Sequence, residues 1–471
     1  MPAPSLLRNW VRRAALLCLT LALLACAESA ARRGVAEWFY HRQTVEGMRL
    51  AVRWNPQSAS YRAGLADALE SSTLEVDLRE AVSLNEQATR LEPQGAQYWA
   101  RLGAAYEADG RPADAARSYR TAVELFPRSP QMNWLLGNFL LRQDDTARAL
   151  TAFRHVVAGS PAMRRATYQT AWGATEDSAQ ILAAMIPSRA EVLADYLQYL
   201  VDTRRLDAAR EVWRKLLDGG FPLPPGGALR YVDAVLAEQR SADAIAAWQA
   251  LAVREPNIYA TEHRPQNSQG AHGAMIEPGG NRVTNGGFEF EVLGSGLDWR
   301  IAPADGVTTR VMAENAFAGA RCLELDFAGT HNVEYSHVFE LVPVEPDTGY
   351  LFTARVRTRQ ISSDQRPRFI LRDARDERLL RVETPAVPVT SDWTELRMEF
   401  RTGPATHVID LRLVRSQSRK FDGRISGTLW IDDVRMIALD ATARVAARHA
   451  PARPSAREPT PGPATLRKSA R

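Results

Sequence analysis

A proline recurs at a fixed interval in the first half of the chain and constrains the fold more than any other feature. Pro93, Pro127 and Pro161 are 34 residues apart, and Pro56 precedes Pro93 by 37 residues. A similar order of large and small apolar residues returns between these prolines, so the chain repeats one structural unit. Because proline cannot continue a helix, the spacing predicts pairs of antiparallel helices. No single pair buries its apolar face alone, so we expect the pairs to stack.

The residues between these prolines resemble the tetratricopeptide repeat. The clearest copy has the family's principal residues at Trp99, Leu102, Gly103, Tyr106, Ala115, Tyr119, Ala122 and Pro127. The next copy keeps Gly137, Phe153 and Pro161 and has Asn133 in place of the first tryptophan. The resemblance implies an α-solenoid of five to six helix pairs over residues 35–256. Its later helices are expected at 191–203, 206–218, 226–239 and 241–251.

Proteins of this family usually bind a partner's peptide in the groove lined by their first helices. Carried onto the two clear copies, the resemblance assigns this groove to Gln97, Glu107, Gln131, Trp134, Asn138 and Arg142. Trp134 is one residue beyond the core tryptophan position, so we expect it to face outward. An exposed tryptophan is costly unless a partner covers it. The alternative is that Trp134 packs on a neighbouring helix.

From Arg282 onward the hydrophobic pattern alternates with a period of two. Tyr350, Phe352, Ala354 and Val356, for example, fall on one face of an extended chain. Such runs, separated by turn signals, predict antiparallel strands. About eight runs fit into residues 281–438, which is the size of a jelly-roll β-sandwich. The predicted fold class is therefore multidomain α and β, with a glycine- and proline-containing linker at 257–280 between the two domains.

The two ends of the β domain resemble the carbohydrate-binding jelly rolls that bacterial glycanases carry. The domain opens with VTNGGFE (283–289) and closes with TLWIDDV (428–434). The resemblance implies a galactose-binding-like fold and sugar binding. It also implies a structural Ca²⁺ held by Glu289, by Asp432 or Asp433, and by backbone carbonyls. The alternative is that these acids are plain surface residues at strand ends; no other cofactor is expected.

Sugar binding requires aromatic or polar side chains outside the core. Trp299, Trp393 and Trp430 match core positions of the family, so we do not assign them to a sugar site. The remaining candidates are Tyr335, His337, Arg355, Arg357 and Arg412. Guanidinium groups bind carboxylates in a bidentate manner, so an anionic glycan is favoured over a neutral one. The alternative is that the arginines form a solvated face.

The N-terminus carries an export signal. Arginines precede the uncharged run Ala14–Ala27, and these fourteen residues fit a signal-peptide core better than the roughly 20 residues that span a bilayer. Residues 23–26, Leu-Leu-Ala-Cys, resemble a bacterial lipobox that would lipidate Cys26. With residues 1–27 as signal peptide or signal anchor, three alternatives remain: a lipoprotein, an uncleaved anchor or a secreted protein. All three predict the periplasm or cell envelope, and the first two predict membrane attachment.

The charge distribution argues against a nucleic-acid-binding fold. The chain has a net charge of +4, whereas residues 441–471 alone carry +6, so the first 440 residues sum to −2. This proline-rich segment without aromatic residues predicts a disordered basic tail over 439–471. The three cysteines, two of them in the apolar run, allow no disulfide framework.

No arrangement of nucleophile, acid and base marks a catalytic site, so we predict that the protein is not an enzyme. The predicted function is that of an exported scaffold. Its solenoid would dock an envelope protein and its jelly roll would bind a polysaccharide, in support of surface polysaccharide assembly or export. One alternative is a purely structural component of an envelope complex, and another is a glycan-active enzyme.

Overall fold

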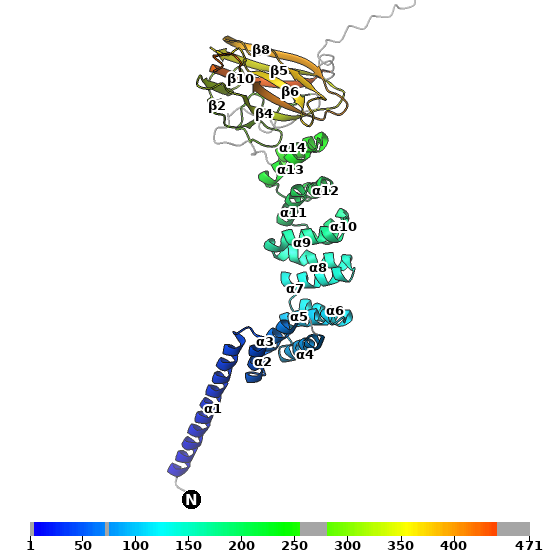
Figure 1. Ribbon diagram of the computed structural model, residues 1–471, viewed down its shortest axis with the longest axis vertical. Coiled ribbons are helices and arrows are strands. Elements are labelled where there is room, and N and C mark those ends of the chain that lie inside the picture. Colours follow the sequence, from blue (N-terminus) through cyan, green and yellow to red (C-terminus); the bar gives the residue numbers. More distant parts are fainter. Residues whose placement is uncertain (1–3, 71–74, 255–279, 440–471) are drawn as a thin grey trace, which may run out of the picture. The chain divides into compact units, whose positions relative to one another are not determined.

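The computed structural model describes residues 4–70, 75–254 and 280–439, and helices precede strands along the chain (Figure 1). The predicted combination of a helical solenoid and a β-sandwich is confirmed. The predicted linker (257–280) and tail (439–471) lie almost wholly outside the described residues. The chain divides into two compact units, residues 1–199 and 200–471.

The helices of the repeat region follow one another in short antiparallel pairs (Figure 1). The elements of the first unit are α1 (Pro4–Tyr40), α2 (Val45–Trp54), α3 (Ala59–Glu70), α4 (Glu75–Leu91), α5 (Ala96–Ala108), α6 (Pro112–Leu125), α7 (Pro130–Arg142), α8 (Thr146–Gly159), α9 (Pro161–Ala174) and α10 (Ser178–Ala184). The later helices are α11 (Ala190–Asp202), which crosses the division between the units, α12 (Leu206–Asp218), α13 (Pro225–Ala237) and α14 (Ser241–Arg254). The four later helices begin and end within three residues of their predicted bounds.

One hydrogen bond fixes the register of the two clear repeats. Trp99 Nε1 donates to the carbonyl oxygen of Pro93 at 2.8 Å. Asn133, which replaces the tryptophan in the next copy, donates from Nδ2 to the carbonyl oxygen of Pro127 at 3.0 Å. The two side chains differ in chemistry but make the same bond six residues back along the chain. The 34-residue register predicted from the sequence is therefore the structural register.

In each of the two clear repeats an aromatic ring of the second helix lies against a glycine of the first. A Cβ atom at Gly103 would lie 3.0 Å from the ring of Tyr119, and one at Gly137 would collide with the ring of Phe153. Tyr119 is 3% exposed and Phe153 is fully buried. The glycines therefore set how closely the two helices of a repeat cross.

The last helical pair of the second unit contacts the β domain. Asp233 of α13 accepts hydrogen bonds from Ser295 Oγ at 2.6 Å, Gly296 N at 2.9 Å and Arg300 Nη2 at 2.6 Å. A Cβ atom at Gly296 would lie 2.5 Å from the ring of Trp248 in α14. These contacts explain why the division between the units falls inside the predicted helical domain.

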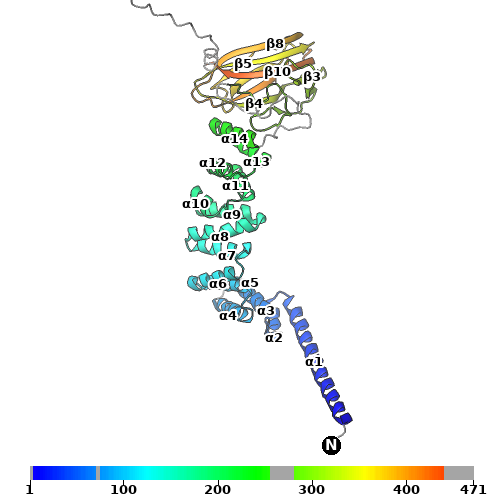
Figure 2. The same cartoon turned by 180° about the vertical axis from the view of Figure 1, so that it is seen from behind.

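The β domain consists of two five-stranded antiparallel sheets that share one core (Figures 1 and 2). The β4 sheet contains β1 (Arg300–Ile301), β4 (Tyr335–Pro343), β9 (Val408–Arg415), β6 (Arg368–Asp373) and β7 (Arg381–Glu383), in this order. The β5 sheet contains β2 (Val307–Met312), β3 (Cys322–Ala328), β10 (Ser426–Ala438), β5 (Gly349–Arg359) and β8 (Ser391–Arg401), in this order.

The alternation in the sequence matches the faces of β5. Tyr350, Phe352, Ala354 and Val356 are fully buried between the sheets, as predicted. The intervening residues of this strand point to the outer face of the β5 sheet, because successive side chains of a strand point to opposite faces.

The opening and closing segments of the β domain lie side by side. Arg282 N donates to Met436 O at 2.8 Å, and Val434 N donates to Gly286 O at 2.9 Å. A Cβ atom at Gly286 would collide with the carbonyl oxygen of Val434. The opening and closing segments, which carry the resemblance to carbohydrate-binding modules, therefore lie against each other in the structure.

Arg415 joins three loops at one end of the sandwich. Its side chain is 1% exposed, although it carries a full guanidinium group. It donates to the carbonyl oxygens of Gln365 and Gly423 at 3.1 and 2.8 Å and to Ser363 Oγ at 3.0 Å. It also donates to Asn332 Oδ1 at 2.8 Å and to the carbonyl oxygen of Val333. Burial lowers the pKa of Arg415, and the oxygen acceptors around it compensate for the lost water.

Replacing Arg415 with alanine is expected to lower the free energy of unfolding of the sandwich by more than about 3 kcal/mol. Several buried acceptors would lose their donor, at about 1–3 kcal/mol each. Urea unfolding followed by tryptophan fluorescence measures the change. Arg401→Ala, at an exposed end of β8, serves as the control and should cost less than about 0.5 kcal/mol. Equal effects of the two substitutions would contradict this role of Arg415.

Candidate functional site

The predicted groove residues in the first unit largely satisfy one another. Arg142 of α7 donates from Nε and Nη2 to the two carboxylate oxygens of Glu107 in α5, at 2.5 and 2.8 Å. Asn138 Nδ2 donates to the carbonyl oxygen of Trp134 at 2.8 Å. Two predicted contact residues thus form a bidentate ion pair between neighbouring repeats. Such a pair stabilises the solenoid and is not free for a partner.

Trp134 is half-buried rather than exposed. Its ring centroid lies 5.5 Å from that of Phe153 in α8. The structure therefore favours the alternative in which Trp134 packs on a neighbouring helix over the one in which it faces outward. Gln97 and Gln131 are exposed on α5 and α7, and their role in binding stays a prediction.

The five predicted glycan-binding residues do not form one site. His337 and Arg412 lie on the β4 sheet, whereas Arg355 and Arg357 lie on the outer face of the β5 sheet. The prediction for Tyr335 is wrong, because its ring is fully buried in the core and its hydroxyl lies 2.9 Å from Thr309 Oγ1. An irregularity in β4 between Tyr335 and Val338 shifts the alternation of faces at this point.

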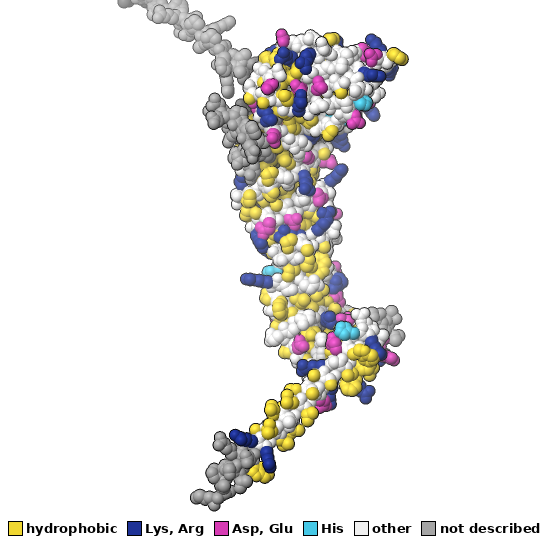
Figure 3. Space-filling view, turned by 90° about the vertical axis from the view of Figure 1, so that its left-hand side faces the viewer, with side chains coloured by type: hydrophobic (Ala, Val, Ile, Leu, Met, Phe, Trp, Pro, Cys, Tyr) yellow, Lys and Arg dark blue, Asp and Glu magenta, His cyan; other side chains and the backbone are white. Residues whose placement is uncertain are grey.

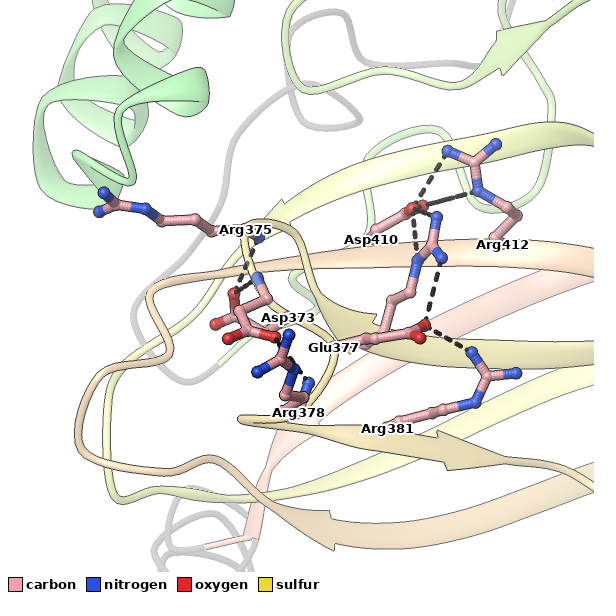
Figure 4. Close-up of polar contacts among 9 residues, drawn as sticks. Asp373, Arg375, Glu377, Arg378, Arg381, Asp410 and Arg412 are labelled. Atoms are coloured by element: carbon pink, nitrogen blue, oxygen red, sulfur yellow. Dashed lines mark hydrogen bonds and ion pairs between the residues drawn. The ribbon is translucent and has the colours of Figure 1, made fainter.

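The arginines on the outer face of the β4 sheet are paired with carboxylates (Figure 4). Arg372 donates to Asp410 Oδ2 from Nε and Nη2 at 3.0 and 2.8 Å, and Arg412 Nε lies 3.1 Å from the same carboxylate. Glu377 lies between Arg372 and Arg381, at 3.5 and 2.7 Å. The two carboxylates of this network neutralise most of the positive charge of its three arginines.

Arg412 has two further contacts that hold its side chain in place. Nη1 donates to the carbonyl oxygen of Ser336 at 2.7 Å, and the guanidinium carbon lies 3.9 Å from the centroid of the Phe339 ring. His337 is half-buried beside this arginine's strand, and its Nδ1 accepts from Ser336 N at 3.2 Å. Arg412 therefore acts first as a structural residue of the β4 sheet.

The outer face of the β5 sheet differs in that its arginines surround a tryptophan. Trp430 of β10 is 5% exposed, and its Nε1 donates to Glu324 Oε2 at 2.8 Å. The guanidinium carbons of Arg357 and Arg359 lie 5.5 and 5.4 Å from the centroid of this ring. Arg310 neutralises Glu324 with bonds of 2.9 and 2.6 Å. Trp430 is thus buried beneath polar side chains outside the hydrophobic core.

Arg357 and Arg359 are weakly neutralised compared with the arginines of the β4 sheet. Arg357 Nε lies 3.9 Å from Asp392, a residue that is almost fully exposed. Arg359 donates to Thr428 Oγ1 at 3.3 Å and has no ion pair with any residue that the structure describes. Sequence reasoning missed Arg359 and assigned Trp430 to the core. The alternation of β10 could have revealed the position of Trp430. Leu429 and Ile431 point into the core, so Trp430 between them points to the outer face.

The two acids predicted to hold calcium converge on one loop. Asp432 Oδ2 accepts from Phe317 N and Ala318 N at 2.7 and 3.0 Å. Glu289 Oε1 accepts from Ala320 N and Arg321 N at 2.8 and 3.1 Å. The two carboxylates therefore hold residues 317–321 against the ends of the domain.

Carboxylate oxygens are ligands that calcium prefers, but Asp432 Oδ2 and Glu289 Oε1 each already accept two backbone hydrogen bonds. A Cβ atom at Gly287 would lie 3.6 Å from Asp432 Oδ1 and 3.8 Å from Glu289 Cγ, so the two acids share one neighbourhood. Asp433 instead pairs with Arg435 at 2.6 Å. The parts of the chain that the structure describes contain no cluster of three His, Cys, Asp or Glu residues suited to a metal. Backbone carbonyls would have to supply the remaining ligands, and calcium binding stays a proposal.

Two further carboxyls are buried without access to solvent. Asp298 is fully buried and accepts from Leu293 N and Trp299 N at 2.7 and 2.8 Å. Glu340 accepts from Thr284 N at 2.8 Å through Oε1, while its Oε2 has no hydrogen-bond partner among the described residues. Burial raises the pKa of Asp298 to about 7 and raises the pKa of Glu340 well above its ordinary value. Neither carboxyl is exposed to a substrate outside the core.

The helix α1 carries the predicted export signal. Within it, Arg12–Tyr40 is long and apolar enough to cross a membrane, judged by length and composition, and its most apolar stretch is exposed. Figure 3 shows hydrophobic side chains along this helix. Cys26 is exposed on it. A signal sequence has the same properties, so cleavage and lipidation at Cys26 stay predictions.

We predict that Asp298 makes the sandwich less stable as the pH rises from about 4 to about 7. A carboxyl whose pKa is raised by folding binds more protons in the folded state, so its contribution to stability falls over this range. Asp298→Asn should therefore show a flatter dependence of Tm on pH. Asp305→Asn, at an exposed position, should keep the slope of the wild type. An unchanged slope in Asp298→Asn would contradict the prediction.

We also predict that Ca²⁺ raises the Tm of the full chain relative to EDTA. A ligand at a hundredfold excess over its Kd stabilises by about 2.7 kcal/mol. Glu289→Gln should abolish the calcium-dependent shift, whereas Glu291→Gln, at an exposed neighbouring position, should retain it. A wild-type Tm that is the same with Ca²⁺ and with EDTA would contradict the calcium proposal.

Comparisons with known proteins found one family match in the repeat region and several similar solved structures. The tetratricopeptide repeat model matches residues 105–163, and no curated protein matches the sequence.

Among solved structures, a family 16 carbohydrate-binding module is similar at 17% identity (33% of this chain, 99% of that chain, TM-score 0.25). PilF of Pseudomonas aeruginosa is similar at 16% identity (49% and 93%, TM-score 0.24). The tetratricopeptide protein YrrB, described as having an unusual peptide-binding site, is similar at 15% identity (46% and 95%, TM-score 0.22). The match to the tetratricopeptide repeat model covers residues 105–163, and the fold of the β domain rests on its own two sheets.

Proposed function

We propose that the protein is an exported, non-enzymatic scaffold that binds a protein through its helical repeats and an anionic glycan through its β-sandwich. In this proposal it serves the assembly or export of a surface polysaccharide in the cell envelope. Attachment through α1, with or without lipidation at Cys26, would keep it at the membrane.

The observation that carries the glycan half of the proposal is the pair of weakly neutralised arginines beside Trp430. Arg357 and Arg359 occupy alternate positions on one face of β5, so their backbones are about 6.8 Å apart. Each guanidinium offers a planar set of donors that matches a carboxylate. A polymer with repeated carboxylates would meet two such sets on a rigid strand.

An exposed aromatic ring next to Arg355, on the same face of β5, supports a sugar in preference to a simple anion. Phe317 is 42% exposed, and its ring centroid lies 5.8 Å from that of Trp393. Arg355 lies over Phe317 at 4.7 Å and pairs with Glu395 at 2.9 Å. The C–H faces of sugar rings can pack on such aromatic surfaces while their carboxylates reach the arginines.

The protein-docking half is supported by the repeats themselves. Stacked helical pairs present long continuous surfaces, and proteins with this architecture use them to bind partners. The alternative, a purely structural component of an envelope complex, gives both halves protein partners. The charge pattern of the β5 sheet favours the glycan, because a solvated arginine face does not require a neighbouring exposed aromatic ring such as Phe317.

We predict that the full chain in detergent binds an acidic polysaccharide such as alginate and does not bind neutral dextran. The double substitution Arg357→Ala and Arg359→Ala should weaken alginate binding by about tenfold or more, a loss of about 1.4 kcal/mol. Biolayer interferometry at constant ionic strength measures both affinities, because charged contacts depend on salt.

Arg378→Ala provides the matched control, since Arg378 is 90% exposed on a loop after β6. Its affinity for alginate should equal that of the wild type. Binding that survives the double substitution would contradict the assigned face. The absence of binding to acidic and neutral polymers alike would favour the purely structural alternative.

A further inference from the structure

A groove opens between two second helices of the clear repeats, away from the predicted binding residues. It has a volume of about 740 Å³ and is bounded by α6, α7 and α8. This volume lies within the range of about 300–1,000 Å³ that is typical of ligand pockets. None of Gln97, Glu107, Gln131, Trp134, Asn138 and Arg142 lines it.

Small side chains on both walls explain why the groove stays open. Ala116 of α6 and Ala152 of α8 are among the residues that line it, and their side chains fill little space. Leu136 and Leu140 of α7 form an apolar floor, and both are only half-buried. Two neighbouring leucines left half-exposed in a concave site provide apolar surface that a partner can bury.

The rim of the groove has more hydrogen-bond donors than acceptors. Arg120 on α6 and Arg148 and His155 on α8 are exposed at its edge. The carboxylate at the rim, Asp145, already lies 3.3 Å from Arg148. Arg120 bonds only to a carbonyl of its own helix, Ala116 O at 3.1 Å, among the contacts of the described residues. The rim therefore complements a ligand with carboxylates.

We propose that this groove binds a peptide that places apolar side chains on Leu136 and Leu140 and carboxylates at Arg120 and His155. The inference rests on the proposed docking function and names its site and the chemistry of its partner. The alternative groove between the first helices is less suited, because Glu107 and Arg142 already neutralise each other there.

The test selects binders for the full chain in detergent from a phage library of random short peptides. The enriched peptides should combine large apolar residues with Asp or Glu. Fluorescence polarisation with the best peptide, labelled with fluorescein, then measures affinity for variants. Thr151→Trp fills the groove from an exposed position, and Arg120→Glu reverses the charge of the rim. Each should weaken binding by about tenfold or more.

Matched controls carry the same changes outside the groove. Ala147→Trp lies one turn before Thr151 on α8, and Arg128→Glu lies in the loop after α6; neither residue lines the groove. Both should retain wild-type affinity. Circular dichroism of all four variants checks that the helices remain folded.

Other outcomes overturn the inference in distinguishable ways. Peptides that bind equally to Thr151→Trp and Arg120→Glu, or that lose affinity in Trp134→Ala instead, would keep the docking function but assign it to another surface. Enriched peptides with basic rather than acidic residues would contradict the proposed partner chemistry. If no peptide is enriched, both this groove and the proposed docking function lose their support.

Discussion

The close approach of an aromatic ring to a glycine sets the geometry on which the helical repeats depend. In the two clear repeats, Tyr119 packs against Gly103 and Phe153 packs against Gly137, and each contact brings the two helices of its repeat together. Since each repeat contacts mainly its neighbours, the distance between the two helices of one repeat influences how the next repeat stacks on it. A groove stays open between α6 and α8, and the small side chains of Ala116 and Ala152 are among those that line it.

Neutralisation of arginine, rather than its abundance, distinguishes the two faces of the sandwich. On the β4 sheet, Asp410 and Glu377 lie between arginines and form a closed network. On the β5 sheet, Arg357 and Arg359 lie over the ring of Trp430 and keep most of their charge available. A fully paired face adds rigidity to the sheet, whereas a face with available guanidinium groups can bind an anion.

Most of the fold followed from periodicity, and the site did not. The proline spacing and the small residues predicted the helical pairs, and the alternation predicted β5, because both patterns reflect burial over many residues. The strands β1 and β7 have two and three residues, which is too short for a period to be detected. Tyr335 is buried, and an irregularity in β4 between Tyr335 and Val338 changes the parity of its face, which the sequence pattern does not reveal. The pairing of Arg412 depends on Asp410 and on Ser336, 76 residues earlier in the chain, and one sequence does not reveal such a partner.

Hydrogen exchange of the full chain with and without an acidic polysaccharide tests the central claim most directly. Slower exchange is expected in residues 353–359 of β5 and 428–432 of β10, which form the face with the available arginines. The segments 368–373 and 408–415 of the β4 sheet should exchange at unchanged rates. Protection of those segments instead, or of neither sheet at saturating polymer, would contradict the assignment of the glycan site.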